Sequence, residues 1–277
     1  MIHYQQAAPS QLAQLEQLWL SVFGDTPAFI HAFYMHWYPR GIILTALDGA
    51  ETVGMLHLLP LEGCGRDAPH DLLYCYACAV RPDHRGQGIC TELFRQAAAI
   101  GQCRKADLLL VPANQPLVIL YERFGFRTVP FYSIASAGYK PAALMHARLS
   151  EPEPSAYAAV RQHCFDTLPY TGFWDPETLR FVLNDLKECG GFALLMQMEK
   201  DACAVLGTRR GDTLDLTELA APAAQRDALF QLLLRRFGCR QLKCRVPFES
   251  SLPCRSGMIL PHAGNVPESC WFPLDLL

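Results

Sequence analysis

The stretch that decides the fold reads CAVRPDHRGQGIC and spans residues 78–90. An apolar run without charge leads into it from residue 72, which is typical of a central strand of a sheet. After it, apolar residues recur at helical spacing between Ile89 and Ile100, and Gly101 gives a natural stop. This order predicts a strand, a sharp turn and a helix.

The turn Arg85-Gly86-Gln87-Gly88 has the composition of an anion site. Glycines let main-chain amides converge at a helix N-terminus, where the helix dipole favours negative charge. Arg85 adds a positive charge beside it. An ordinary glycine-containing turn is the alternative interpretation. A phosphate loop for ATP is disfavoured, since the turn lacks the Lys-Ser/Thr ending that ATP and magnesium require.

Downstream, the sequence NQPLVILYERFGF at residues 114–126 predicts a short helix ended by Gly125. Together, the two stretches resemble the GNAT superfamily of acyl-CoA-dependent N-acyltransferases. The cofactor motif of that family is an Arg or Gln, two further residues, a Gly, one further residue, and then a Gly or Ala. Arg85 matches the first position of this motif, and Gly88 matches the Gly. Cys90 departs from the pattern, and we interpret it as a small side chain packed inward rather than a nucleophile.

The resemblance implies an α+β fold with a central mixed sheet flanked by helices, acetyl-CoA as cosubstrate, and no metal. It implies that Tyr121 protonates the leaving thiolate, a role that suits a phenol. The alternative for Tyr121 is a core aromatic packed near Phe124 and Phe126. The resemblance also implies main-chain contacts with pantetheine at the strand end, pyrophosphate binding at the turn, and a pantetheine contact at the asparagine. The cofactor-binding residues are then Cys78, Ala79, Val80, Arg85, Gly86, Gln87, Gly88, Ile89, Cys90, Thr91 and Asn114.

The general base is less clearly marked, because no Asp or Glu lies within residues 72–80, where many relatives place one. Chain proximity leaves four candidates: His57, Glu62, His70 and Asp71. A fifth, the carboxylate of Leu277, comes from a resemblance to the aminoglycoside acetyltransferases of the enhanced-intracellular-survival type, which combine a catalytic unit with a degenerate one.

The sequence of the second half predicts a degenerate structural copy of the first half. The stretch SEPEPS at residues 150–155 marks a boundary between a catalytic GNAT domain at 1–149 and a GNAT-like domain at 150–277. The order of hairpin, strand, helix and strand repeats after it. Its strand-to-helix junction has no glycine, and Pro222 lacks an amide donor, so we expect one cofactor per chain and a structural role for this half.

Composition limits the partners. The 277 residues include 24 basic and 27 acidic ones, and the net charge of -3 predicts no nucleic-acid or membrane partner. The start of the chain resembles no signal sequence, so we expect a cytoplasmic protein. A primary amine of a small molecule or peptide is the expected acceptor, and homo-oligomerisation stays open. The alternative function is a non-catalytic acyl-CoA-binding or regulatory module.

The twelve cysteines are expected to be reduced thiols, mostly small buried apolar residues. Cys75 and Cys78 form a C-x-x-C within the expected strand, where residues three apart point to opposite faces. Cys239 and Cys244 have no second ligand pair at zinc-finger spacing. The sequence therefore predicts no metal site.

Overall fold

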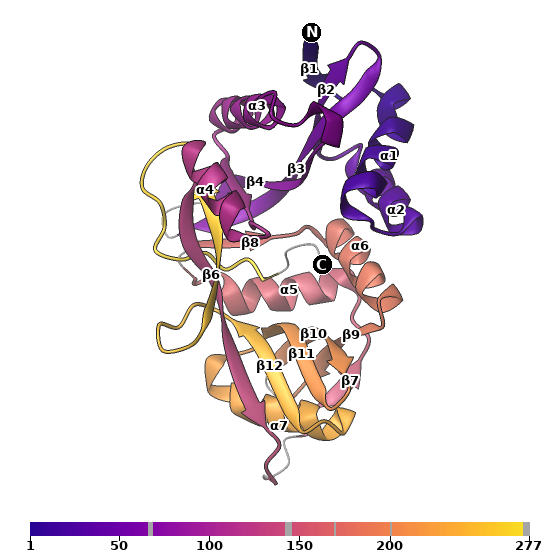
Figure 1. Ribbon diagram of the computed structural model, residues 1–277. Helices are drawn as coiled ribbons and strands as arrows, with labels where there is room; N and C mark the ends of the chain where they lie inside the picture. The colour runs from indigo at the N-terminus through magenta and orange to yellow at the C-terminus, as the bar shows by residue number, and fades with distance from the viewer. Residues whose placement is uncertain (66–68, 142–145, 169, 200, 274–277) are drawn as a thin grey trace. The chain divides into compact units, whose positions relative to one another are not determined.

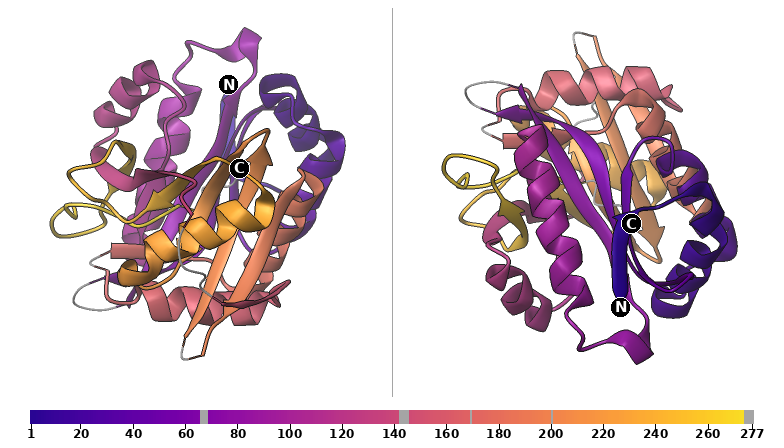
Figure 2. Two further views of the ribbon diagram at one scale, coloured as in Figure 1. Left: turned by 90° about the horizontal axis from the view of Figure 1, so that it is seen from below. Right: turned by 90° about the horizontal axis from the view of Figure 1, so that it is seen from above.

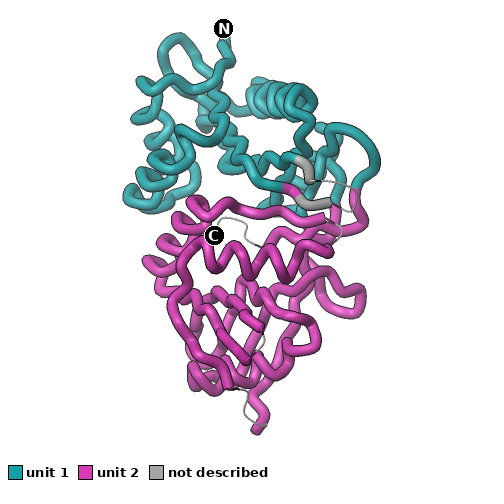
Figure 3. Tube along the Cα trace, turned by 180° about the vertical axis from the view of Figure 1, so that it is seen from behind, with its two compact units in different colours: residues 1–62, 70–128, 257–266 teal, residues 63–69, 129–256, 267–277 magenta. Residues whose placement is uncertain are grey.

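The computed structural model describes residues 1–65, 69–141, 146–168, 170–199 and 201–273. The chain divides into two compact units, coloured separately in Figure 3. The first unit comprises residues 1–62, 70–128 and 257–266, and the second comprises 63–69, 129–256 and 267–277. The functional division into domains 1–149 and 150–277 stays a prediction.

The first unit is built on a mixed sheet in the order β1-β2-β3-β4-β5-β13 (Figure 1). Its strands are β1 (Ile2–Gln6), β2 (Ile42–Asp48), β3 (Glu51–Gly65), β4 (Pro69–Val80), β5 (Asp107–Leu110) and β13 (Cys254–Leu260). The expected hairpin is confirmed, because β2 and β3 pair antiparallel. The strand–turn–helix prediction is confirmed too, since α3 (Ile89–Arg104) connects the parallel strands β4 and β5.

Helices cover both faces of this sheet (Figure 2). On one face, α3 packs on a cluster of buried aliphatic residues from β2 to β5, and α4 (Gln115–Arg123) joins it through a ring contact between Phe94 and Tyr121. On the other face lie α1 (Leu12–Phe23), preceded by the 3-10 turn η1 (Pro9–Gln11), and α2 (Pro27–Trp37). The turn Arg85-Gly86-Gln87-Gly88 thus follows a strand buried on both sides.

The predicted stop of α3 at Gly101 is wrong. The helix continues to Arg104 and ends at Lys105, which adopts a left-handed conformation with φ 56°. Gly101 is buried instead, and a Cβ there would lie 3.0 Å from the Ala106 carbonyl oxygen. Glycine at this position allows the helix to approach the following strand closely.

The predicted opposite orientation of Cys75 and Cys78 is also wrong. Ala77 between them has φ 45°, an unusual conformation for a residue with a Cβ and one found at β-bulges. The extra residue shifts the alternation of side chains, so both cysteines contact the cluster under α3. Among the residues described, no three His, Cys, Asp or Glu side chains are arranged to hold a metal ion.

The second unit has a comparable sheet in the order β6-β12-β11-β10-β9-β7. The strands β9 (Gly191–Gln197), β10 (Ala202–Arg210) and β11 (Thr213–Ala220) pair antiparallel in succession, and β11 pairs parallel with β12 (Gln241–Val246). The predicted repeat of element order is therefore confirmed. The other elements are α5 (Pro154–Phe165), α6 (Pro176–Glu188), η3 (Ala223–Gln225), α7 (Arg226–Phe237), β6 (Arg127–Gly138), β7 (Arg148–Ser150) and β8 (Tyr170–Phe173).

The two units receive their last strands from unexpected parts of the chain. Most of β6 lies in the first half of the sequence but belongs to the second unit, where it pairs with β12. Met258 to Leu260 of β13 come near the C-terminus and belong to the first unit, where they pair antiparallel with β5. The first unit thus needs residues from both ends of the sequence. No helix in the described ranges has the length and apolar character that crossing a membrane requires.

Candidate functional site

The turn Arg85-Gly86-Gln87-Gly88 has the backbone geometry of an anion site. Gly86 and Gly88 have φ 76° and 78°, a region in which glycine is strongly favoured. Gly88 is the N-cap of α3, and within the described structure no side chain caps the helix. The first amides of α3 are therefore available to an anionic group, which the helix dipole also favours. The exposed Arg85 folds back, and its Nε donates to the Val80 carbonyl oxygen at 3.1 Å.

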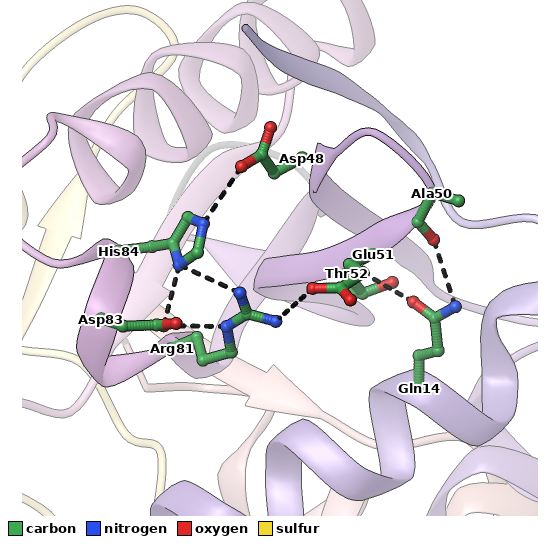
Figure 4. Close-up of polar contacts among 8 residues, drawn as sticks. All are labelled: Gln14, Asp48, Ala50, Glu51, Thr52, Arg81, Asp83 and His84. Atoms are coloured by element: carbon green, nitrogen blue, oxygen red, sulfur yellow. Dashed lines mark hydrogen bonds and ion pairs between the residues drawn. The ribbon is translucent and has the colours of Figure 1, made fainter.

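A network of hydrogen bonds among charged residues holds residues 81–84, which precede this turn (Figure 4). Arg81, directly after β4, donates to Glu51 at 2.7 Å and to Asp83 at 2.8 Å. His84 lies 2.8 Å from Asp83 and 3.3 Å from Asp48. The 3-10 turn η2 (Pro82–His84) is thereby tied to the β2–β3 connection.

Sequence reasoning missed this network. The hydrogen bond from His84, followed by that from Arg81, lowers the pKa of the Asp83 carboxyl to about 2. The same contact with Asp83 raises the pKa of His84 above its ordinary value. The charges of the RPDH stretch were visible in the sequence, but their partner Glu51 lies thirty residues away and no local pattern connects it.

The strand end opens where the pantetheine arm was expected. Register between β4 and β5 runs from Leu72–Asp107 to Tyr74–Leu109, while β4 itself continues to Val80. Past Tyr74, the strand bulges at Ala77. On the side of β5, the main chain of residues 78–80 therefore extends beyond the paired segment, as an amide-containing ligand between two strands would require.

Asn114 and Tyr121 lie on one short helix. The Asn114 Oδ1 accepts a hydrogen bond from the Leu117 amide at 3.1 Å and caps α4, so this side chain sets where the helix begins. In the last turn of α4, the half-buried Tyr121 has its ring centroid 5.1 Å from that of Phe94. Burial raises the pKa of the Tyr121 phenol above its ordinary value, and the neighbouring thiols of Cys78 and Cys90 add to the effect.

The structure thus brings Tyr121, Cys78 and Cys90 together. The Sγ atoms of the two cysteines are 3.8 Å apart, and both side chains are half-buried against the α3 cluster. Cys90 packs inward, in agreement with our interpretation of it. Among the remaining predicted cofactor residues, Ile89 is buried under the first turn of α3, while Gln87 and Thr91 are exposed.

The base candidates have contrasting environments. His57 is fully buried beneath α1 and α2, 3.1 Å from the Tyr34 hydroxyl and 3.3 Å from the Tyr76 carbonyl oxygen. Glu62 and Asp71 are exposed. The side chain of His70 and all of Leu277 lie outside the described residues.

Burial lowers the pKa of His57 to about 4, which predicts a pH-dependent stability. An unfolded histidine takes up a proton near pH 6.5 whereas the native His57 does not, so stability is full above that pH and falls as the pH drops. The loss between pH 7.5 and pH 5 should be about 2 kcal/mol. Urea denaturation of wild type and His57→Gln at a series of pH values measures this loss. If the free energy of unfolding changed equally with pH in the two proteins, the lowered pKa of His57 would be contradicted.

Gly54 on β3 is expected to be intolerant of a side chain, because a Cβ there would lie 2.8 Å from the Ile89 Cγ2 atom and 3.2 Å from the Ala46 Cβ. Gly54→Ala should push on the first residue of α3 and lower the free energy of unfolding by about 1–3 kcal/mol. Gly138→Ala is the control, since its nearest neighbour would be 3.9 Å away. Urea denaturation compares the two variants, and equal stabilities would refute the close contact.

Comparison with known proteins agrees with this geometry. Residues 11–126 match the model of the acetyltransferase (GNAT) family. No curated protein sequence gives a significant match. The similar solved structures include a GCN5-related N-acetyltransferase from Kribbella flavida (TM-score 0.73, 13% identity, 94% of this chain and 70% of that chain). Another, from Anabaena variabilis, has TM-score 0.75 and 13% identity over 95% of this chain and 73% of that chain. Eis1 from Mycobacterium abscessus has TM-score 0.72 and 13% identity over 95% of this chain and 74% of that chain.

The likeness to these structures extends over both units and establishes the fold. Fold and turn define an acyltransferase with the GNAT architecture, in which a mixed sheet carries a glycine-rich turn between a bulged strand and a helix. Residues 11–126, which lie almost wholly in the first unit, belong to the GNAT acetyltransferase family.

Proposed function

We propose that this acetyltransferase moves the acetyl group of acetyl-CoA to a primary amine of a small molecule or peptide by direct attack in a ternary complex. The observation that carries the proposal is the presence, in one compact unit, of an uncapped glycine turn, a bulged strand end and a half-buried tyrosine whose pKa is raised by burial. These three parts correspond to binding of pyrophosphate, binding of pantetheine and protonation of the leaving group.

The proposed contacts with the cosubstrate follow from the backbone. The pyrophosphate would accept hydrogen bonds from main-chain amides of the turn and of the first helical residues, Gly86 to Thr91, with the positive charge of Arg85 nearby. The pantetheine amides would pair with the main chain of Cys78, Ala79 and Val80. No side chain needs to donate in either place, which explains why Cys90 is compatible with the motif.

Tyr121 is the proposed general acid. When the amine attacks the thioester carbonyl, the C–S bond breaks and CoA leaves as a thiolate, which needs a proton. The raised pKa of Tyr121 keeps its phenol protonated at neutral pH. Because Asn114 caps the helix that carries Tyr121, we propose that it positions this acid in addition to the pantetheine contact expected from the resemblance.

The second half is proposed to have a structural role. Its strand-to-helix junction contains Pro222 and the 3-10 turn η3 before α7, and no glycine lies between β11 and that helix. Proline lacks an amide donor, so this junction is poorly suited to hold pyrophosphate. One acetyl-CoA per chain is the resulting stoichiometry.

Binding and turnover test the proposal separately. Titration calorimetry with acetyl-CoA should give a stoichiometry of one per chain, and a thiol-release assay over a panel of primary amines should detect free CoA. Binding without turnover on any amine would favour a non-catalytic acyl-CoA-binding module. The absence of acetyl-CoA binding would reject the proposed site.

A further inference from the structure

Two thiols face each other across the two segments that we propose to contact acetyl-CoA, the end of β4 and the first turn of α3. Cys78 belongs to the end of β4 and Cys90 to the first turn of α3, and their Sγ atoms are 3.8 Å apart. The bulge at Ala77 directs Cys78 toward α3. Both residues are partly exposed, and Cys90 lies in the first turn of α3, so a small oxidant would approach the pair from the Cys90 side.

We propose that Cys78 and Cys90 form an oxidisable dithiol whose disulfide closes the acetyl-CoA site. The formation of the disulfide depends on the geometry of the two thiols alone, whereas its effect on acetyl-CoA rests on the proposed function. The modification is reversible and would couple transfer activity to the redox state around the protein.

The distance between the sulfurs explains why the bond would affect binding. A disulfide requires an S–S distance near 2.05 Å, so the two atoms must approach by about 1.8 Å. In the proposed closure, rotation of the two side chains and movement of the first turn of α3 toward the strand end together supply this approach. Those two segments hold the proposed pyrophosphate and pantetheine contacts, so the oxidised protein presents them at an altered spacing.

The roles of the two thiols differ. Hydrogen bonding with Cys78 lowers the pKa of the Cys90 thiol, and the same contact raises that of Cys78. Cys90 also lies in the first turn of α3, where the helix dipole favours an anion, so it is the group that more readily becomes a thiolate, the nucleophilic form. This role concerns oxidation alone, because the proposed acetyl transfer does not use Cys90 as a nucleophile. Cys75, also near the pair, is fully buried and its pKa is raised by burial, which makes it the less reactive neighbour.

The oxidation is balanced with a peroxide as the oxidant. The Cys90 thiolate attacks hydrogen peroxide, forms a sulfenic acid and releases hydroxide. The Cys78 thiol then displaces the sulfenic oxygen as water and forms the disulfide. In total, two thiols and one peroxide give one disulfide and two water molecules, and the two sulfurs supply both electrons. A dithiol reductant restores the thiols by exchange.

Peptide mapping tests formation of the bond directly. Trypsin cleaves after Arg85, between the two cysteines, so a disulfide joins two peptides that otherwise separate. We expect the joined pair after treatment of the full-length protein with hydrogen peroxide, and its loss after dithiothreitol. The control Cys103→Ser, an exposed cysteine on the same helix, should leave the cross-link intact. Absence of the cross-link while exposed cysteines oxidise would overturn the proposal.

Calorimetry with acetyl-CoA, which has no free thiol, tests the consequence. Peroxide should raise the Kd of wild type and of Cys103→Ser at least tenfold, and dithiothreitol should reverse the change. Cys90→Ala should show less than a twofold difference between treated and untreated protein. Unchanged affinity in protein with a mapped disulfide would overturn the closure. If reduced protein binds no acetyl-CoA, the proposed function fails and the closure with it, while the cross-link is still scored by mapping.

Discussion

Tyr121→Phe is expected to lower kcat by about 10²–10⁴-fold, the usual contribution of a positioned general acid. The substitution removes the phenol proton and keeps the ring that contacts Phe94 and Phe126. Affinity for acetyl-CoA should change less than about twofold, because the proposed cosubstrate contacts come from the turn and the strand end. Thiol release on an amine substrate and calorimetry with acetyl-CoA measure the two effects.

The control for Tyr121 is Tyr139→Phe, which removes a hydroxyl from a tyrosine that is 47% exposed outside the site. It should leave kcat unchanged. A Tyr121→Phe protein that retained full turnover would show that Tyr121 is a core aromatic only. The pH profile of wild type adds a second readout: because the pKa of Tyr121 is raised above 10, its deprotonation should not reduce kcat between pH 7 and pH 10.

The second large effect is expected at Glu218, in the core of the second unit. Both carboxylate oxygens accept from the Arg161 Nε, at 3.0 and 2.8 Å, and Tyr157 donates to one of them at 3.0 Å. Arg161 is 1% exposed and Glu218 is fully buried. Removing one member of such a pair leaves a buried charge without its counterion, so Glu218→Ala should cost about 3–5 kcal/mol.

Two comparisons show whether the loss of stability in Glu218→Ala comes from the buried charge and not from substitution of a charged residue in general. The exposed pair of Lys187 and Glu151 has a similar separation, 3.4 Å, but Glu151→Ala should cost less than about 1 kcal/mol because solvent screens it. The double variant Arg161→Met with Glu218→Leu should recover most of the lost stability, since no charge remains buried. Urea denaturation measures all three proteins. A loss below 1 kcal/mol for Glu218→Ala would contradict the argument.

The stability of the second unit has a bearing on the proposed chemistry. Residues 129–256 lie between the two parts of the chain that build the first unit, because β13 pairs with β5 there. At the end of that return, the His262 amide and ring Nδ1 both contact the Asp107 Oδ1, at 2.8 and 2.7 Å. The first unit, to which we assign the chemistry, is therefore complete only when residues 257–266 have returned to it.

Much of the candidate site could be predicted from the sequence because its determinants are local. The glycines of the turn select left-handed backbone at Gly86 and Gly88, and Asn114 caps the helix that begins beside it. The periodicity of apolar residues places α3 directly after the turn. The partners of His57 could not be predicted in this way, because Tyr34 comes from α2 and packs on β3 only in the folded sheet.

By itself, the sequence determined the strand–turn–helix order around Arg85 to Gly88, the helix that carries Tyr121, and the repeated order of elements in the second half. Tight turns, caps and helical spacing act over a few residues, so these features are encoded locally. Tertiary structure decided the placement of Cys78 beside Cys90, the burial of His57 and the return of β13 to the first sheet. Each depends on a bulge or on pairing between distant segments, whose free energy comes from packing of the whole sheet and not from the sequence around either partner.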